Sequence, residues 1–475
     1  MKKLNELIEC KYDTPISGIK TNSKDIKPGD LFVAIHGFNC DHHDYIMDAI
    51  NRKASAIISE KKVETNIPVV LVNNTNDSLQ TICKKYYDNV EEKLDFIGVT
   101  GTDGKTTTTT IISKILEEKL ACANMGTNGL FYKGFHESLN TTTPEFEKLY
   151  EKLSTLKNQG CKTVAMEVSS EALLHKRVEN LKYKVAILTN ITGDHMNIHK
   201  TMDNYVDAKG QLFKKVRDDG YCILNNDDKY TSNIKKYCQG TIYTYGKSET
   251  SDFRIYSITE KDSMTEFAIS YKDKQYNLTT HLKGEYNVYN VTAAFACCYL
   301  LGVEPTYIKE KILNIKSITG RGERLEFGQN YDIVLDYAHT ANAIESILTE
   351  LKKEGYKRII TITGSAGGRE KEKRSKMGKT VLDLSDHVIF TMDDPRNEKV
   401  SDIINDLIGD STKTNYEKIE NRENAIFKAL AMAQDGDVVA ILGKGRDNYM
   451  AIGTEKIPYC DYEVIEKYFI NKNED

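Results

Sequence analysis

Short apolar runs separated by polar turns characterise residues 1–94. LFVAI at 31–35, AIIS at 56–59 and PVVLV at 68–72 have the length of buried strands. The stretch His43–Arg52 between the first two runs has the pattern of a helix. The pattern therefore predicts a small α/β domain over residues 1–94.

Strand and helix patterns alternate on a larger scale over residues 95–327. The expected strands are FIGVT, VAMEV and VAILTNI. Helices are expected from Thr106 and from Thr201 to Val216, and a polar loop is expected after VAMEV. Such alternation is typical of a mostly parallel sheet with helices on both faces. We predict a central domain of this kind over residues 95–327.

A third alternating set begins near Tyr331. Its expected strands are DIVLDYA, RIITITG, HVIFTMD and VVAILGKG, and the charged, glycine-bearing segment GRGERLEFG before it has the composition of a linker. This set predicts a Rossmann-like C-terminal domain over residues 328–475. The predicted fold class is therefore α/β with three domains.

Polar segments follow seven of the expected strands. In open α/β sheets, ligands bind beyond the carboxyl ends of the strands. The segments are GTDGKT, EVSS, TGDH, YAHT, GSAGGR, DDPR and GKGRD. Since they come from two domains, we expect a catalytic cleft between the central and C-terminal domains.

The run DFIGVTGTDGKTTTTT has the features of a phosphate-binding loop between a strand and a helix. Gly101 and Gly104 allow backbone N–H groups to converge on phosphate oxygens. Lys105 supplies a positive charge, and Thr106 supplies a hydroxyl group for Mg²⁺. The spacing departs from the common G-x-x-x-x-G-K-[ST], because Val99 stands six positions before Lys105. The loop predicts an ATP- or GTP-binding protein with a P-loop ATPase-like central domain; an ordinary glycine turn before a helix is the alternative.

Composition narrows the range of partners. The 475 residues carry a net charge of -5 without a long basic run, so nucleic acid is not an expected partner. Ten cysteines without a C-x-x-C fit reduced thiols in the cytoplasm. Neither a signal sequence nor a membrane span is expected.

Cys40, His42 and His43 in CDHHDY suggest a zinc site. Adjacent histidine side chains point in divergent directions, however, and no second ligand pair lies nearby, so no zinc site is expected there.

Several single residues have two interpretations. Glu167 at a strand end is either a Mg²⁺ ligand, with His195 as a further one, or a carboxylate held by backbone N–H groups. Lys209 lies on the apolar stripe of its helix, and the pattern alone favours an amine that extends into water over an amine that reacts with CO₂ to form a metal-binding carbamate. Asn287 and Asn290 also have two interpretations: they either hydrogen-bond a nucleotide base or cap a helix.

An ordered set of motifs resembles the ATP-dependent Mur ligases of peptidoglycan synthesis, and among them the MurE type. The motifs are NSKDIKPGDLFVAIHG, GTDGKTTTT, TTTPE, MEVSSEAL, LTNITGDHMNIH with AKGQLF, GEYNVYN, GRGER, DYAHT, DDPR and GKGRD. The resemblance runs nearly end to end. It implies three domains that bind the UDP-sugar peptide, ATP and the incoming amino acid. The motifs favour a Mur ligase over another ligase, of the folylpolyglutamate or cyanophycin type. They also favour it over two other classes of protein, a nucleotide switch and a binding protein that has lost catalysis.

The resemblance implies a role for each matching position. Catalytic residues are Lys105, Glu167, His195 and Lys209, and metal ligands are Thr106, Glu167, His195 and Lys209 as a carbamate. ATP-binding residues are Gly101, Thr102, Asp103, Gly104, Lys105, Thr106, Thr107, Asn287, Asn290, Arg321 and His339. UDP-sugar-peptide contacts are Ser23, Thr142, Thr143, Ser169 and Arg177. Amino-acid contacts are Asp393, Asp394, Arg396, Gly443 and Asp447.

The implied reaction uses ATP and Mg²⁺ to join an amino acid to UDP-N-acetylmuramoyl-L-alanyl-D-glutamate through an acyl phosphate. Arg396 favours meso-diaminopimelate as the amino acid, since its guanidinium group matches the second carboxylate of that substrate. Asp447 would contact the distal ammonium, and Arg446 would add positive charge to the pocket.

We expect a cytoplasmic monomer that binds no membrane. Four departures from the family pattern, at Asp103, Glu171, GSAGGREKEKR and GKGRD, lie near the substrates. They leave open a paralogous ligase acting on a different amino acid or acceptor.

Overall fold

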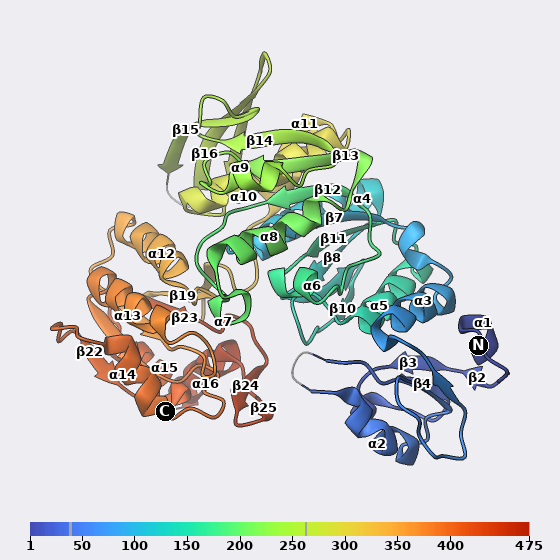
Figure 1. The fold of residues 1–475 in the computed structure, drawn as a ribbon. Coiled ribbons are helices and arrows are strands. Elements are labelled where there is room, and N and C mark those ends of the chain that lie inside the picture. Colours follow the sequence, from blue (N-terminus) through green and yellow to red (C-terminus); the bar gives the residue numbers. More distant parts are fainter. Residues whose placement is uncertain (38–39, 262–263, 475) are drawn as a thin grey trace.

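The computed structural model describes residues 1–37, 40–261 and 264–474, which form three α/β bodies (Figure 1). The N-terminal body has a parallel four-stranded sheet in the order β3 (Gly18–Lys20), β4 (Asp30–Val33), β5 (Ala56–Ser59), β6 (Val69–Leu71). A short pair, β1 (Lys2–Lys3) and β2 (Pro15–Ile16), flanks α1 (Leu4–Leu7). The helix expected at residues 43–52 is a 3₁₀ turn, His42–Tyr45, that continues into α2 (Ile46–Asn51). A 3₁₀ turn at Ser23–Asp25 and α3 (Thr75–Tyr86) complete this part.

The N-terminal body is attached to the central one through α5 (Phe146–Asn158). Lys20 pairs with Glu151 at 3.0 Å, and Lys148 of α5 pairs with Asp25 at 2.9 Å. Between these partly buried pairs, the Thr21 hydroxyl donates to the buried Glu147 carboxylate over 2.9 Å. A 3₁₀ turn at Val90–Glu92 then leads into the central sheet.

The central sheet has eleven strands and is parallel from β8 to β15. In spatial order they are β10 (Phe135–Glu137), β9 (Gly129–Tyr132), β8 (Cys122–Gly126), β11 (Thr163–Glu167), β7 (Asp95–Thr100), β12 (Tyr183–Leu188), β13 (Val216–Asn225), β14 (Thr241–Gly246), β15 (Phe253–Lys261), β16 (Met264–Tyr271) and β17 (Lys274–Thr280). The antiparallel pairs lie at the two ends of the sheet. The expectation of a mostly parallel sheet is confirmed.

Helices cover both faces of this sheet. On one face α4 (Lys105–Leu120), α10 (Glu285–Leu300) and α11 (Pro305–Asn314) form one apolar core, and α5 and α8 (Met202–Phe213) belong to the core of the other face. The short helices α6 (Ser170–Leu174), α7 (Met196–His199) and α9 (Thr231–Lys235) lie between strands. The helix expected to reach Val216 ends at Phe213, because Val216 starts β13. Part of the polar loop expected after β11 is α6.

The C-terminal sheet has six strands in the order β18 (Glu323–Leu325), β19 (Asp332–Asp336), β23 (Val438–Leu442), β20 (Ile359–Thr363), β21 (His387–Phe390) and β22 (Tyr416–Lys418), with only β18 antiparallel. One face packs on α12 (Ala341–Lys353), α13 (Glu372–Leu384) and α14 (Val400–Ile408), and the other on α15 (Arg422–Met432) and α16 (Asp461–Glu474). A hairpin, β24 (Tyr449–Ile452) and β25 (Glu455–Pro458), projects beside it. Since β18 already belongs to this sheet, the linker is partly strand. The domain boundaries at residues 94/95 and 327/328 stay predictions.

Within the described residues, no helix is both long enough and apolar enough to cross a membrane.

Candidate active site

A cleft of about 1170 Å³ lies between the central and C-terminal bodies. Each of the seven polar segments singled out in the sequence contributes to its lining, with Lys105, Glu167, His195, His339, Arg369, Arg396 and Asp447 among the lining residues. The carboxyl ends of two sheets therefore face one another across a single cavity, as the strand pattern predicted.

The phosphate-binding loop requires its two glycines. Gly101 has φ +151° and Gly104 has φ +82°, both in the region that favours glycine. A Cβ on Gly101 would lie 1.8 Å from Thr189 Oγ1, and one on Gly104 would lie 2.4 Å from Asn290 Oδ1. The loop therefore fits closely between the end of β12 and α10, which fixes its N–H groups at the start of α4.

Lys105 is folded back over this loop. Its Nζ donates to the backbone oxygens of Gly101 and Thr102 over 3.0 and 2.7 Å. Burial lowers the pKa of Lys105, although Glu167 and Asp103 act in the opposite direction. The Oδ2 atom of Asp103 is enclosed without a hydrogen-bond partner, and burial raises the pKa of that carboxyl group.

Two candidate metal ligands line the cleft and are held by neighbours. Arg321 Nη2 donates to Thr106 Oγ1 over 2.7 Å. Glu167 is 1% exposed, and its Oε1 accepts the Thr127 N–H over 2.7 Å while its Oε2 accepts the Thr127 hydroxyl over 3.2 Å. The backbone-held arrangement of Glu167 is thus present, and it leaves lone pairs on both oxygens. A carboxylate and a hydroxyl beside a phosphate loop are hard oxygen donors of the kind that Mg²⁺ prefers, so these residues fit that ion.

His195 lies between two carboxylates. Its Nδ1 is 3.2 Å from Glu171 Oε1, and its Nε2 is 3.3 Å from Asp194 Oδ2. The hydrogen bond with His195 is the main reason that the pKa of Glu171 falls to about 2. Burial would raise the pKa of Asp194, but the charges of His195 and Lys373 lower it overall.

Lys209 is buried at its amine. The residue is 1% exposed, its Nζ donates to Gly101 O over 2.8 Å, and the amine lies 4.3 Å from the centre of the Tyr205 ring. The expectation from the pattern alone, an amine extending into water, is therefore wrong. Burial, followed by the charge of Lys105, lowers the pKa of Lys209 well below its usual value, which favours the unprotonated amine.

Asn287 and Asn290 line the cleft and also bond to one another. Asn287 Nδ2 donates over 2.7 Å to the backbone oxygen of Lys283, which lies just before α10, and Asn290 Nδ2 donates to Asn287 Oδ1 over 3.2 Å. The Thr108 hydroxyl donates to Asn290 Oδ1 over 3.3 Å. The pair thus joins α10 to α4, and contact with a nucleotide base stays a prediction. The other ATP-site candidates in the cleft are Thr102, Asp103, Gly104, Thr107, Arg321 and His339.

The predicted amino-acid contacts gather at the C-terminal side of the cleft around a lysine that we did not predict. Lys444 is 1% exposed, and its Nζ lies 2.9 Å from Asp394, 3.5 Å from Asp447 and 3.9 Å from Asp393. This lysine partly neutralises three carboxylates. Its position in GKGRD, just after the buried strand β23, is the sequence signal that could have identified it. Gly443 and Arg396 line the same side.

The two arginines next to this pocket differ in what they contact. Arg396 has φ +51° and donates from Nη1 to Gly367 O, and none of the described acidic side chains lies within ion-pair distance of it. Arg446 instead pairs with Glu323 through two nitrogens, at 3.0 and 2.6 Å, and lies 3.6 Å from the Tyr462 ring centre. Arg446 is not among the cleft-lining residues. The expectation that it adds positive charge to the amino-acid pocket is therefore wrong.

The residues expected to contact the UDP-sugar peptide are divided between two bodies. Thr142, Ser169 and Arg177 line the cleft. Thr143 is fully buried, where its hydroxyl donates to Glu167 O over 2.9 Å and accepts the Ser169 N–H, so it supports the site from behind. Ser23 lies in the N-terminal body and is not among the cleft-lining residues.

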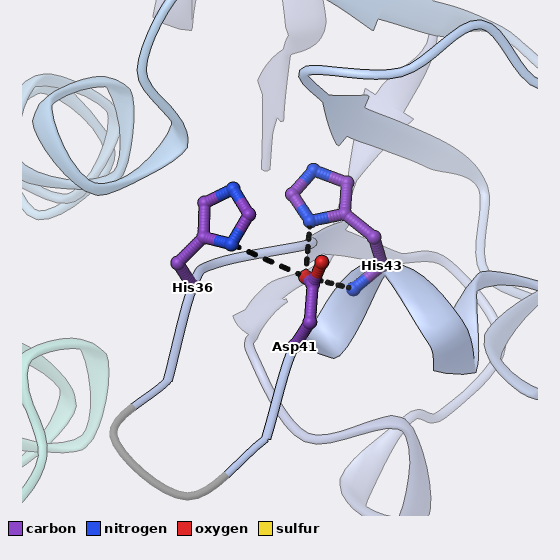
Figure 2. A group of neighbouring side chains, drawn as sticks. All are labelled: His36, Asp41 and His43. Carbon is purple, nitrogen blue, oxygen red and sulfur yellow. Dashed lines mark hydrogen bonds and ion pairs between the residues drawn. The ribbon is translucent and has the colours of Figure 1, made fainter.

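A histidine cluster in the N-terminal body has potential metal ligands but is satisfied by hydrogen bonds. Figure 2 shows His36, Asp41 and His43 converging, with His43 Nδ1 2.6 Å from Asp41 Oδ1. The Glu60 N–H donates to His43 Nε2 over 3.1 Å, so the ring proton is on Nδ1 and points at Asp41. Neither nitrogen of His43 therefore has a free lone pair for a metal, and the cluster differs from the Cys40, His42 and His43 set considered in the sequence.

A glycine-bracketed phosphate loop in a cleft between α/β bodies defines a P-loop nucleotide-binding enzyme. The chain matches three family models, described as Mur ligase family, catalytic domain over residues 15–90, Mur ligase middle domain over 99–298, and Mur ligase, glutamate ligase domain over 320–445. The chain belongs to the Mur ligase family.

Individual relatives extend this similarity to the full length. The chain is 35% identical over 480 residues to the UDP-N-acetylmuramoyl-L-alanyl-D-glutamate–2,6-diaminopimelate ligase of Bacillus cereus, with 98% of each chain covered. A solved structure of a ligase with the same name has a TM-score of 0.65 at 25% identity and covers 99% of both chains. The MurF ligase of Thermotoga maritima in complex with ADP has a TM-score of 0.69 at 20% identity, with 97% of this chain and 98% of that one covered. The last likeness concerns the fold alone.

Proposed function

We propose that the protein is an ATP-dependent ligase that joins meso-diaminopimelate to UDP-N-acetylmuramoyl-L-alanyl-D-glutamate in peptidoglycan synthesis. The observation that supports this most directly is that one cleft contains the Lys105 loop, Glu167 and His195 on one wall and Arg396 on the other. Arg396 donates to a backbone oxygen, and no carboxylate of the described residues pairs with it. The relatives at full-length similarity carry the name of this activity.

In the proposed reaction, the terminal carboxylate of the dipeptide attacks the γ-phosphorus of ATP, the bond to the β-phosphate oxygen breaks, and ADP leaves. The amine of the amino acid then attacks the acyl carbon and loses a proton, and phosphate leaves as the amide forms. Lys105 and the N–H groups of the loop neutralise charge on the transferred phosphoryl group. The protein supplies no covalent nucleophile, and its main contribution is to hold three substrates in line.

Mg²⁺ is part of this proposal. Thr106, Glu167 and His195 would hold it, together with Lys209 after the Lys209 nitrogen bonds to CO₂ and releases a proton. The ion, when bound, supplies positive charge at the phosphate oxygens. The lowered pKa of Lys209 supports the carbamate, since only the neutral amine reacts with CO₂.

Recognition of the amino acid is assigned to Arg396, whose guanidinium would bind the distal carboxylate with two hydrogen bonds. The UDP-sugar peptide would extend from the cleft towards Ser23 in the N-terminal body. We further propose that the enzyme acts in the cytoplasm as a monomer and needs no nucleic acid or membrane partner.

The test is phosphate release by the purified full chain with ATP, Mg²⁺ and UDP-N-acetylmuramoyl-L-alanyl-D-glutamate against a panel of amino acids. meso-Diaminopimelate is expected to give the highest kcat/KM, and mass spectrometry should show the amide product. Equal or better turnover with lysine or a neutral amino acid would contradict the proposed substrate. It would then support a paralogous ligase.

A further inference from the structure

Glu171 lies at a contact between the two bodies that form the cleft. It belongs to the first turn of α6 in the central body. Its Oε1 is 3.2 Å from His195 Nδ1 and 3.7 Å from Arg369 Nη1 of the C-terminal body. One carboxylate oxygen therefore contacts both a candidate metal ligand and a cation that arrives only with the other domain.

His195 needs such support because its backbone is strained. Its φ of +59° lies in the left-handed region, which non-glycine residues rarely occupy, and it precedes the single-turn helix α7. A histidine that ligates a metal through one ring nitrogen donates its other N–H to an oxygen acceptor, which fixes the tautomer and the ring orientation. Glu171 provides that acceptor at Nδ1. Nε2 is thereby left to ligate, with Asp194 Oδ2 beside it at 3.3 Å.

The C-terminal body contacts the same segment at two further points, one from the start of α13 and one from the loop before it. Lys373 Nζ lies 3.3 Å from Asp194 Oδ1, and the Asn197 N–H donates to Glu370 Oε1 over 3.2 Å. The residues on both sides of His195 are therefore held by the C-terminal body, and His195 itself is held through Glu171.

We infer that Glu171 is a positioning residue that orients His195 for metal binding and couples this orientation to docking of the C-terminal domain through Arg369. The inference rests on the proposed function only in that it uses the same metal site. It predicts that metal affinity depends on a residue of the other domain that is not itself a ligand.

The experiment measures Mn²⁺ binding to the full chain, with a non-hydrolysable ATP analogue bound, by electron paramagnetic resonance. Glu171→Ala is expected to weaken Mn²⁺ binding by about 10- to 100-fold. Arg369→Ala should weaken it in the same direction, and the double variant should lose no more than Glu171→Ala alone, because Arg369 acts through Glu171. Glu171→Gln keeps an acceptor for the Nδ1–H and should recover part of the affinity.

Glu179→Gln is the matched control, since Glu179 pairs with Lys215 at 2.7 Å in the same region without contacting His195. It should leave Mn²⁺ affinity unchanged. Circular dichroism checks that each variant is folded. Unchanged Mn²⁺ affinity in folded Glu171→Ala, or fully additive losses in the double variant, would overturn the inference. Mn²⁺ binding is measured without an amino acid, so the result does not depend on which amino acid is ligated. If Mn²⁺ affinity depends on Glu171 and Arg369 but the protein does not ligate diaminopimelate, the proposed function is refuted and the inference stands.

Discussion

The buried amine of Lys209 donates a hydrogen bond to the backbone oxygen of Gly101, over 2.8 Å. Gly101 is the first glycine of the phosphate loop, so α8 and the loop are joined at the point where phosphate is expected to bind. The same carbonyl oxygen accepts from Lys105. A lysine on an apolar helix face is thus hydrogen-bonded directly to the candidate phosphate loop.

Lys209→Ala is expected to lower kcat by at least about 100-fold, because it removes the group proposed to become the carbamate ligand. A short carboxylic acid such as acetate should restore part of the activity by supplying the missing oxygens. In the wild type, ¹³C-labelled bicarbonate should give a carbamate NMR signal that Lys209→Ala lacks. The exposed Lys214, directly after the end of the same helix, provides the control, and Lys214→Ala should retain both signal and activity. A fully active wild type without the carbamate signal would contradict the assignment.

Lys105→Ala is expected to reduce ADP formation by at least about 100-fold, since no other group in the loop can replace a positive charge at the transferred phosphate. ADP release in a coupled assay measures the effect. Lys119→Ala, at the exposed end of the same helix, should behave as wild type. If ADP formed at the normal rate in Lys105→Ala, the loop would not be the phosphoryl-transfer site.

Arg396→Ala is expected to raise the KM for meso-diaminopimelate by about 10- to 100-fold, the value of a lost charge-assisted bidentate contact of about 1.5–3 kcal/mol. The KM for ATP should change little. Arg446→Ala should leave the KM for diaminopimelate unchanged, because Arg446 pairs with Glu323 outside the pocket. Initial rates at varied amino acid distinguish the two arginines, and an equal effect of both would refute the pocket assignment.

Arg422→Met is expected to destabilise the C-terminal domain by about 3–5 kcal/mol, since it leaves a buried carboxylate without its partner. Arg422 pairs with Asp461 at 2.7 Å, and both side chains are 0% exposed. Hydrogen exchange of amides in β23 and α15 measures the loss locally. Replacing Asp461 with leucine as well should recover much of the stability, and a lack of recovery would show that the effect comes from packing.

The ion pair of Glu398 with Arg374, at 2.9 Å, predicts an acid-dependent loss of stability. The hydrogen bond from Arg374 holds the pKa of Glu398 at about 2 against an ordinary value of 4.5. Because the folded pKa is depressed, the contribution is present above pH 4.5 and is lost as the pH falls towards 2. We expect the variant Glu398→Gln to be less stable at neutral pH, on the order of 1–3 kcal/mol, and to show a shallower acid dependence.

The measurement is the free energy of opening of the amides in α13, by hydrogen exchange between pH 4.5 and the acid limit of folding. Glu423→Gln is the comparison, because Glu423 forms an exposed pair with Lys467 whose side chains are 36% and 57% accessible. Exposed pairs contribute about 0–1 kcal/mol, so this variant should match the wild type. Identical acid profiles for Glu398→Gln and wild type would show that the pair does not contribute.

Local sequence was sufficient to predict the P-loop and the strands that precede the seven polar segments. The period of the apolar runs determines which segments are buried, and the glycines at 101 and 104 permit backbone conformations that other residues rarely adopt. The same reasoning did not find β13 to β17 as a continuous extension of the central sheet. Those strands alternate irregularly, and their pairing depends on the sheet edge that β12 presents.

The sequence by itself determined the α/β class, the phosphate loop and the seven polar segments at strand ends, because each depends on neighbours close in the chain. The tertiary structure decided the surroundings of single side chains. It buried the amine of Lys209, directed Arg446 to Glu323, and placed Lys444 among three aspartates. It also brought Arg369 to Glu171 across the domain boundary. Burial and charge pairing depend on residues far apart in sequence, so these contacts exist only once the domains have folded and met.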